Sequence, residues 1–429
     1  MLVQPSPDIR RPKCGASTVI LLALMPLVAF HSKKVREIYT FPDHSSPGLD
    51  QGAGLIDVDN QGRLLIWQGP YEAHLPYLLW DFQRQAVVSN FSAHIPKEVQ
   101  AKSLPGPTGI FFQPSGRVVV FRRPWLILED PIRNEEIRHV VPNPLYLGPG
   151  ILNRPGTSAG GPGIEIPAIN PHDGSVAVAF NVHGNIMVYV YDAELEKPLG
   201  AWSLPRYVQG LAWSPAGDRL AILFNGRLDG TGPPITEDDV YQFHEGNRTA
   251  PGDDVWIVEP RSGNPLVKFR TGSNEWRIAF SPDGRIVYVI QDFYYSYPPD
   301  RSVIQGFSAI SGDRVHTFTA GPRGVHMNFA VSPDGKLIAA DASTEVRQML
   351  PWREPVYGAK MARVVLLDSG TGKLLFEHDE KTDGEFSDPL EFAFSPDSRF
   401  LFVNFALSDH IPYNHIEVFS LDDLRDQGG

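Results

Sequence analysis

Four side chains in this sequence carry groups suited to acid–base chemistry or to holding a small polar ligand. Glu275, His326 and Glu391 supply carboxylates and an imidazole, which donate and accept protons in many enzymes. Arg277 could pair with an acidic group on a ligand. The same residues could equally be the polar ends of strands, satisfied by water and by one another. The sequence leaves both interpretations open.

Aromatic side chains are concentrated in the long segments that separate the apolar runs. Such rings supply a large contact area at low entropic cost and favour protein surfaces or sugar faces. They could instead pack these segments against one another, but as a set they favour a binding surface. The candidate partner-binding residues are Tyr71, Tyr241, Tyr294, Tyr295, Tyr297, Trp352, Tyr357 and Tyr413, together with Arg277.

Metal-binding signals are weak. The sequence contains no H-E-x-x-H pattern and no phosphate-binding G-x-x-x-x-G-K-[ST] pattern. Asp238-Asp239 lacks the spacing of a calcium loop, and His410 and His415 have no obvious third metal ligand. Cys14 is the only cysteine, which excludes an intramolecular disulfide. We expect no cofactor and no metal, and we favour a protein that is not an enzyme.

The elements that position the candidate residues are seven copies of one pattern: an apolar run, a tight turn and a second apolar run. Three copies have the turn Ser-Pro-Asp, at Ser281, Ser332 and Ser395. Glu275, His326 and Glu391 each lie a few residues before one of these turns. Other polar residues shortly before the repeated turns are Glu165, Gln209, Asn328 and Asp388. The first apolar run of several copies also contains an alanine: Ala168, Ala212, Ala279, Ala330 and Ala393.

The seven turns are centred on positions 62, 116, 174, 217, 284, 335 and 398. Their separations suit a propeller blade of four strands, which needs about 40–50 residues. The last copy lacks a fourth strand, and residues 34–41 have the missing pattern. We predict an all-β fold, a seven-bladed β-propeller of four-stranded antiparallel blades. Its ring is closed by this N-terminal strand, which pairs with Ile416–Phe419 and covers an open edge.

The Phe-Ser-Pro-Asp-Gly turn at 280–284 and the later Asp-x-x-Thr-Gly-Lys turn at 368–373 resemble those of WD-repeat-like propellers. They are also similar to the TolB-type and YVTN-type repeats of bacterial relatives. The resemblance covers residues 34–423 and implies a propeller architecture, although Trp80-Asp81 is the only Trp-Asp pair. Propellers of this kind include scaffolds, sugar binders and enzymes, so the resemblance implies no single activity.

The N-terminal region predicts export. Basic residues precede an uncharged apolar run from Thr18 to Phe30, the layout of a signal peptide. Residues 1–30 would be a signal peptide or a membrane anchor, and residues 31–429 a single propeller domain. The net charge of -12 and the absence of a basic stripe argue against nucleic acid as a partner. We expect a monomer in the periplasm, the cell envelope or the extracellular space, held to a membrane only if the N-terminal segment is uncleaved.

Long insertions and tight turns are expected on opposite faces of the propeller. In each blade the first-to-second and third-to-fourth turns are short, whereas the long segments follow second or fourth strands. Since loops on a rigid scaffold carry most binding residues, we predict a non-catalytic platform that binds a protein or a glycan through one aromatic face. The alternative is a hydrolase or lyase acting on a small acid or sugar, with Glu275, His326 and Glu391 as its acid–base groups.

Overall fold

The computed structural model describes residues 35–41, 53–68, 76–92, 109–122, 125–142, 165–182, 185–205, 208–224, 255–271, 274–292, 303–319, 328–342, 344–345, 359–380, 387–407 and 415–425. The chain divides into two compact units, Met1–Lys33 and Lys34–Gly429, and every described residue belongs to the second. The predicted signal segment, residues 1–30, lies outside the described residues.

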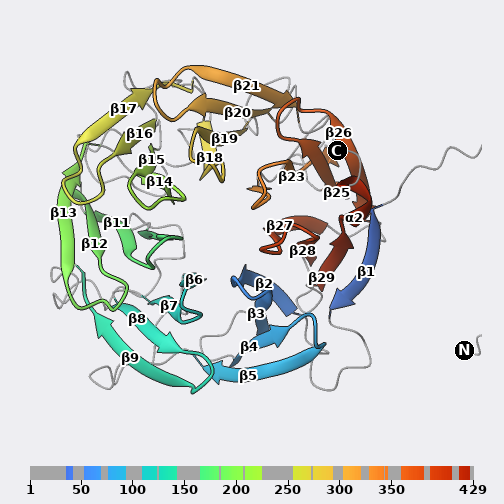
Figure 1. The fold of residues 1–429 in the computed structure, drawn as a ribbon, viewed down its shortest axis with the longest axis horizontal. Helices are drawn as coiled ribbons and strands as arrows, with labels where there is room; N and C mark the ends of the chain where they lie inside the picture. Colours follow the sequence, from blue (N-terminus) through green and yellow to red (C-terminus); the bar gives the residue numbers. More distant parts are fainter. Residues whose placement is uncertain are drawn as a thin grey trace, which may run out of the picture. The chain divides into compact units, whose positions relative to one another are not determined.

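The second unit consists of seven antiparallel sheets arranged in a ring (Figure 1). Short runs rich in β-branched and aromatic residues, such as Ile286–Asp292, favour strands over helices. The predicted seven-bladed all-β fold is therefore confirmed. Blades 1 to 3 are formed by β2 (Ala53–Val58), β3 (Arg63–Gln68), β4 (Pro76–Asp81) and β5 (Ala86–Ser92); by β6 (Gly109–Phe112), β7 (Val118–Arg122), β8 (Trp125–Asp130) and β9 (Glu135–Val140); and by β10 (Glu165–Ile169), β11 (Val176–Val182), β12 (Asn185–Tyr191) and β13 (Pro198–Leu204).

The remaining blades follow the same order, with the first strand of each blade nearest the centre of the ring (Figure 1). They are formed by β14 (Val208–Trp213), β15 (Leu220–Phe224), β16 (Val255–Val258) and β17 (Pro265–Phe269); by β18 (Asn274–Phe280), β19 (Ile286–Asp292), β20 (Val303–Ser308) and β21 (Arg314–Thr319); by β22 (Phe329–Val331), β23 (Leu337–Asp341), β25 (Ala359–Asp368) and β26 (Leu374–Glu380); and by β27 (Ser387–Phe394), β28 (Phe400–Leu407), β29 (His415–Ser420) and β1 (Arg36–Phe41).

The Ser-Pro-Asp turns are held by a repeated side-chain network. In blade 5 the Ser281 hydroxyl donates to Asp283 at 2.5 Å and accepts the Ile286 N–H at 3.0 Å. Asp283 also accepts the Arg285 N–H, and Gly284 has a φ of 68°, a left-handed conformation that glycine adopts without strain. Hydrogen bonds from Ser281 oppose burial and hold the pKa of Asp283 below its usual range. Each turn thus fixes the register of the two innermost strands.

The core lies between the blades. Apolar residues of neighbouring sheets interleave, as where Leu223 and Ile257 of blade 4 join Val287 and Phe307 of blade 5 in one buried cluster. Such face-to-face packing of sheets buries both surfaces of a blade. The ring is therefore stabilised by seams between blades rather than by one central core.

The first and last blades meet in the same way. β1 pairs antiparallel with β29, from Arg36 opposite Ser420 to Phe41 opposite Ile416. This is the pairing of the N-terminal strand with Ile416–Phe419 that the sequence predicted. A buried cluster joins Leu64 and Trp80 of blade 1 to Phe402 and Val418 of blade 7. Blade 7, the last in the sequence, is thus completed by β1, which is the first described strand of the chain.

The structure departs from a uniform ring in blade 6. The two-residue strand β24 (Thr344–Glu345) pairs with Ala359 and Met361 at the start of β25, which makes this sheet five-stranded. The sequence predicted four strands in every blade and did not predict β24. The chain after β23 pairs antiparallel with the first residues of β25, and this pairing adds the short strand β24 to the sheet. The short helix α2 (Asp422–Arg425) ends the described chain.

Candidate functional site

The predicted partner-binding rings lie outside the described residues. This applies to Tyr71, Tyr241, Tyr294, Tyr295, Tyr297, Trp352, Tyr357 and Tyr413, and equally to His326. Glu275 lies in β18 opposite Gln291, at a β-bulge between Glu275 and Arg277. Of the candidate catalytic and partner-binding residues, the structure describes the side chains of Arg277 and Glu391, and it brings these two together.

Arg277 and Glu391 meet in the centre of the ring. Arg277 Nη2 donates to Glu391 Oε1 at 2.5 Å, and Asn328 Nδ2 donates to Glu391 Oε2 at 3.3 Å. These residues belong to blades 5, 7 and 6, respectively. A contact between blades 5 and 7 spans blade 6, so both charged side chains must project inward from the innermost strands. They remain partly open to solvent, with 43% of the Arg277 side chain and 37% of the Glu391 side chain exposed.

A further carboxyl, that of Asp57 in β2, lies near this pair. Asp57 Oδ1 accepts the Val58 N–H and Oδ2 accepts the Phe112 N–H of blade 2, both at 2.8 Å. Burial raises the pKa of Asp57 to about 6 against the opposing effect of these two N–H groups, and the negative charge of Glu391 adds to the rise. We call Asp57, Arg277, Asn328 and Glu391 the central polar cluster.

The cluster was only partly predictable. Arg277, Asn328 and Glu391 all stand four residues before the first residue of their turns, at Ser281, Ser332 and Ser395. Asp57 stands two residues before its own turn, which begins at Asp59 and is one residue shorter. That place holds alanine in five blades and Phe111 in blade 2. Aligning the seven turns identifies Asp57 as the exception. The turn after Asp57 lacks the Ser-Pro pair, so the sequence alone did not show that Asp57 corresponds to these alanines.

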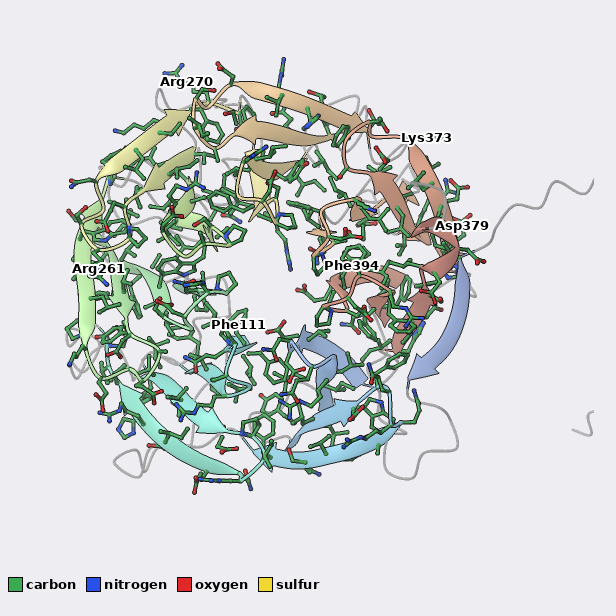
Figure 2. The ribbon with its side chains drawn as sticks, in the orientation of Figure 1. Phe111, Arg261, Arg270, Lys373, Asp379 and Phe394 are labelled. Atoms are coloured by element: carbon green, nitrogen blue, oxygen red, sulfur yellow. The ribbon has the colours of Figure 1, made fainter. Side chains whose placement is uncertain are left out.

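Phe111 borders the same region. It occupies the inner edge of β6, facing the middle of the ring (Figure 2). A Cβ atom on Gly109 would lie 2.6 Å from Phe111 Cε2, so the phenyl ring covers the place where a side chain at position 109 would project. Gly109 stands four residues before its turn, like Arg277 and Glu391. The Phe111 ring therefore lies over the position in blade 2 that corresponds to Arg277 in blade 5 and to Glu391 in blade 7.

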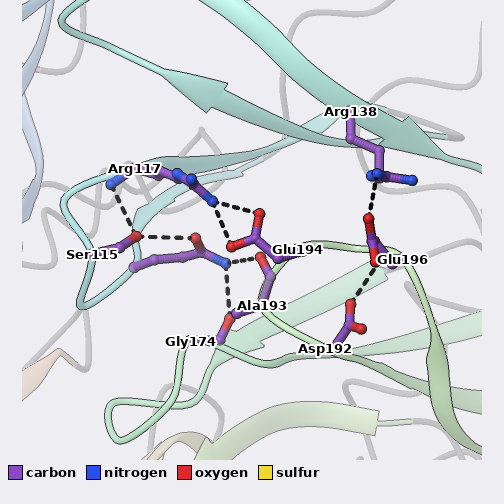
Figure 3. Close-up of polar contacts among 9 residues, drawn as sticks. Ser115, Arg117, Arg138, Gly174, Asp192, Ala193, Glu194 and Glu196 are labelled. Atoms are coloured by element: carbon purple, nitrogen blue, oxygen red, sulfur yellow. Dashed lines mark hydrogen bonds and ion pairs between the residues drawn. The ribbon is translucent and has the colours of Figure 1, made fainter.

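The turn face, defined here as the end of the ring that carries the first-to-second and third-to-fourth turns, is cross-linked from blade to blade (Figure 3). Gln113 Nε2 of blade 2 donates to the carbonyl oxygens of Gly174 and Ala193 of blade 3, both at 2.8 Å. Beside it, Arg117 binds Glu194 through both carboxylate oxygens at 2.6–2.7 Å. Polar side chains on this face are therefore used to hold neighbouring blades together.

The opposite end of the ring is the insertion face, which carries every connection that follows a second or fourth strand. Antiparallel pairing within each blade fixes this placement, because successive connections alternate between the two ends. The long segments 225–254, between β15 and β16, and 293–302, between β19 and β20, both leave from this end. Six of the eight predicted partner-binding rings lie in such segments, and Trp352 and Tyr357 lie in the segment between β24 and β25.

One further sequence pattern contains a candidate nucleophile. Gly156-Thr157-Ser158-Ala159-Gly160 fits G-x-S-x-G, which marks a nucleophilic serine when it forms a turn between a strand and a helix. It lies between β9 and β10, outside the described residues. We therefore assign Ser158 no role.

Two other kinds of site were sought in the described part of the chain. There, no group of three or more His, Cys, Asp or Glu residues is arranged to hold a metal ion. Among these same residues, no helix has the length and apolar character needed to cross a membrane.

Known structures share this fold. A chain from the crystal structure of the mitotic checkpoint complex matches 94% of this chain and 99% of its own length, with a TM-score of 0.53 and 15% identity. The shared fold is a seven-bladed β-propeller. A chain of Kuenenia stuttgartiensis hydrazine synthase matches 74% of this chain and 81% of its own, with a TM-score of 0.48 and 15% identity. No protein-family model matches the sequence, and no curated protein does. At this identity the propeller likeness concerns the fold alone.

Proposed function

We propose that this propeller is a non-catalytic platform that binds another protein through its insertion face. The observation that carries the proposal is the placement of the connections: strand pairing puts the long segments on one face and the tight turns on the other. Loops presented by a rigid scaffold are the common location of binding residues. The matched chain in the mitotic checkpoint complex shows a propeller serving as part of a complex.

The composition of the long segments supports a protein partner. Tyr294, Tyr295 and Trp352 lie in two of them, and tyrosine and tryptophan are enriched among residues that dominate binding energy at protein interfaces. The turn face is a poorer candidate, because side chains such as Gln113 and Arg117 are engaged between blades. A glycan is the other partner that aromatic faces suit.

The test compares three versions of the full chain as bait in extracts of the native host. The first is unchanged, and the second carries Tyr294→Ala, Tyr295→Ala and Trp352→Ala. The third is a control with Ile310→Ala and Leu266→Ala, which removes two apolar side chains that are 76% and 54% exposed in and beside turns of the turn face. We expect one protein to be retained by the first and third baits and lost by the second. Retention by all three baits would contradict the proposal.

We also propose that residues 1–30 direct export. The support is the run of basic residues followed by an apolar stretch. Fractionation of the native host, with detection by an antibody against the propeller, tests this. We expect the protein outside the cytoplasm, and replacement of Leu21, Leu22 and Leu24 by Asp should retain it inside. Export that is unchanged by this replacement would contradict the assignment.

A further inference from the structure

The central polar cluster is poorly explained as a device for stability. Arg277 and Glu391 form an ion pair in which both side chains are more than one-third exposed. Such pairs contribute about 0–1 kcal/mol to folding. The seams between blades already fix the ring through buried apolar clusters, including the one that joins blades 4 and 5. The pair, which joins blades 5 and 7, therefore contributes little to the stability of the fold.

The geometry of the cluster presents opposite charges side by side. The guanidinium of Arg277 has five N–H donors, and its contact with Glu391 is made through Nη2. The carboxylate of Glu391 uses one oxygen for Arg277 and the other for Asn328. A ligand that carries both a carboxylate and an ammonium group could replace this internal pairing, with its carboxylate on Arg277 and its ammonium on Glu391.

Two further features favour a ligand with an ammonium group. Asp57 and Glu391 together carry more negative charge than Arg277 neutralises, so the cluster attracts a cation. The Phe111 ring, which lies against Gly109 of β6, offers an aromatic face towards the middle of the ring of blades (Figure 2). Such a face attracts ammonium groups and packs against apolar ones.

From these observations we propose that the centre of the ring is a binding site for a small zwitterion of the α-amino acid class. Arg277 binds the ligand carboxylate, Glu391 and Asp57 attract the ammonium group, and Phe111 contacts the side chain. Glu391 also remains oriented by Asn328 from blade 6. Binding at this site requires no chemical step.

The test measures binding of each of the twenty L-amino acids to the purified full chain, by the shift in melting temperature and then by calorimetry. A ligand that binds only the folded state raises the melting temperature. N-acetylglycine, which lacks the ammonium group, and ethylammonium, which lacks the carboxylate, serve as the matched ligands. We expect at least one amino acid to bind, and both matched ligands to bind about tenfold more weakly or worse.

Variants locate the site. We expect Glu391→Gln and Arg277→Met each to weaken amino-acid binding by about tenfold or more, since each removes a charged hydrogen-bonding partner. Glu194→Gln is the control, because it breaks a comparable Arg–Glu pair, 35% and 53% exposed, on the turn face. Should Arg277→Met fail to fold, Arg277→Lys keeps the charge and should still weaken binding. The proposal is overturned if no amino acid binds, if ethylammonium binds as tightly, or if Glu391→Gln binds as tightly as the unchanged chain.

Discussion

At the scale of single residues, the least expected feature is a carboxyl group at a position that is apolar in the other six blades. Asp57 takes the place that alanine holds in five other blades, and it links blade 1 to blade 2 by accepting the Phe112 N–H. Its neighbours include Glu391, which opposes its ionisation. Such a group makes the stability of the protein depend on pH in an unusual direction.

The Asp57→Ala variant tests this dependence. Because the pKa of Asp57 is about 6 in the folded state and 3.8 when unperturbed, the folded state binds more protons between these values. Its contribution to stability is greatest below pH 4 and is lost as pH rises through 6. At about 1.4 kcal/mol per pKa unit, the loss is of order 3 kcal/mol. Urea unfolding at pH 4 and pH 7 measures this as a difference: between these values the stability of the unchanged chain should fall by this amount relative to that of the variant. Equal pH dependence of the two proteins would contradict the account.

Glu417 shows the opposite behaviour at the seam between blades 6 and 7. It is buried, with His378 Nε2 at 2.9 Å and His415 Nε2 at 3.5 Å. Burial would raise the pKa of Glu417, but the two imidazoles outweigh it and lower the pKa to about 2. Glu417 therefore contributes stability above its unperturbed value of 4.5, and this is lost as pH falls towards 2.

We expect Glu417→Gln to lower the free energy of unfolding by about 2 kcal/mol at pH 5.5. This is less than the loss of about 3–5 kcal/mol when a fully buried pair is broken, because the imidazoles are 21% and 19% exposed. Denaturant titrations at pH 5.5 and pH 2.5 provide the measurement, and the difference between the proteins should shrink at the lower pH. A difference that stays constant between these pH values would rule out the ionised Glu417 as its source.

At the scale of elements, the third-to-fourth turns of blades 4, 5 and 6 each pack a glycine against an aromatic ring of the outer strand of the blade before. Gly372, with a φ of 70°, lies against Phe318 of β21, and Gly263, also with a φ of 70°, lies against Trp202 of β13. A side chain at either position would collide with the aromatic ring. The repeated glycine thus serves the packing between blades as well as the turn.

The variants Gly372→Ala and Gly62→Ala separate these two roles. Gly62 has a φ of 76° but open space where a Cβ would be, so alanine there should cost about 1 kcal/mol from backbone strain alone. At Gly372 the collision with Phe318 adds about 1–3 kcal/mol of overpacking. Melting temperatures of both variants would show the difference, and equal losses would mean that the contact with Phe318 does not matter.

The elements were predicted better than the site. Seven turns with glycine or serine at a left-handed position define the strand pairs, because turn chemistry acts over a few residues. Contacts across the ring, such as Arg277 with Glu391, join residues far apart in sequence and depend on the exact closure of seven blades. Both residues could therefore be chosen as candidates from the sequence, but their contact with each other could not be predicted. The strand β24 was missed because a two-residue strand has no periodicity to detect.

At the scale of the whole molecule, the ring depends on a strand from the beginning of the chain. β1 pairs with β29, and the adjoining residue Val35 is buried in the cluster that contains Phe419. Without β1, the edge of β29 would be open to pairing with other chains. A chain of residues 42–429 should therefore unfold at a lower temperature and aggregate, compared with residues 34–429. Equal melting temperatures and monomeric behaviour of both would show that β1 is not needed.

The central claim is that one face of the ring binds a protein partner. Photo-crosslinking in the native host tests it most directly, with a photoreactive phenylalanine analogue placed in the full chain at Tyr241, Tyr295 or Trp352 on the insertion face. Gln61 and Ile310 provide matched positions on the turn face, where both are exposed. We predict that the first three positions capture the same protein and that the other two do not. Capture from Gln61 and Ile310, with none from the insertion face, would contradict the account.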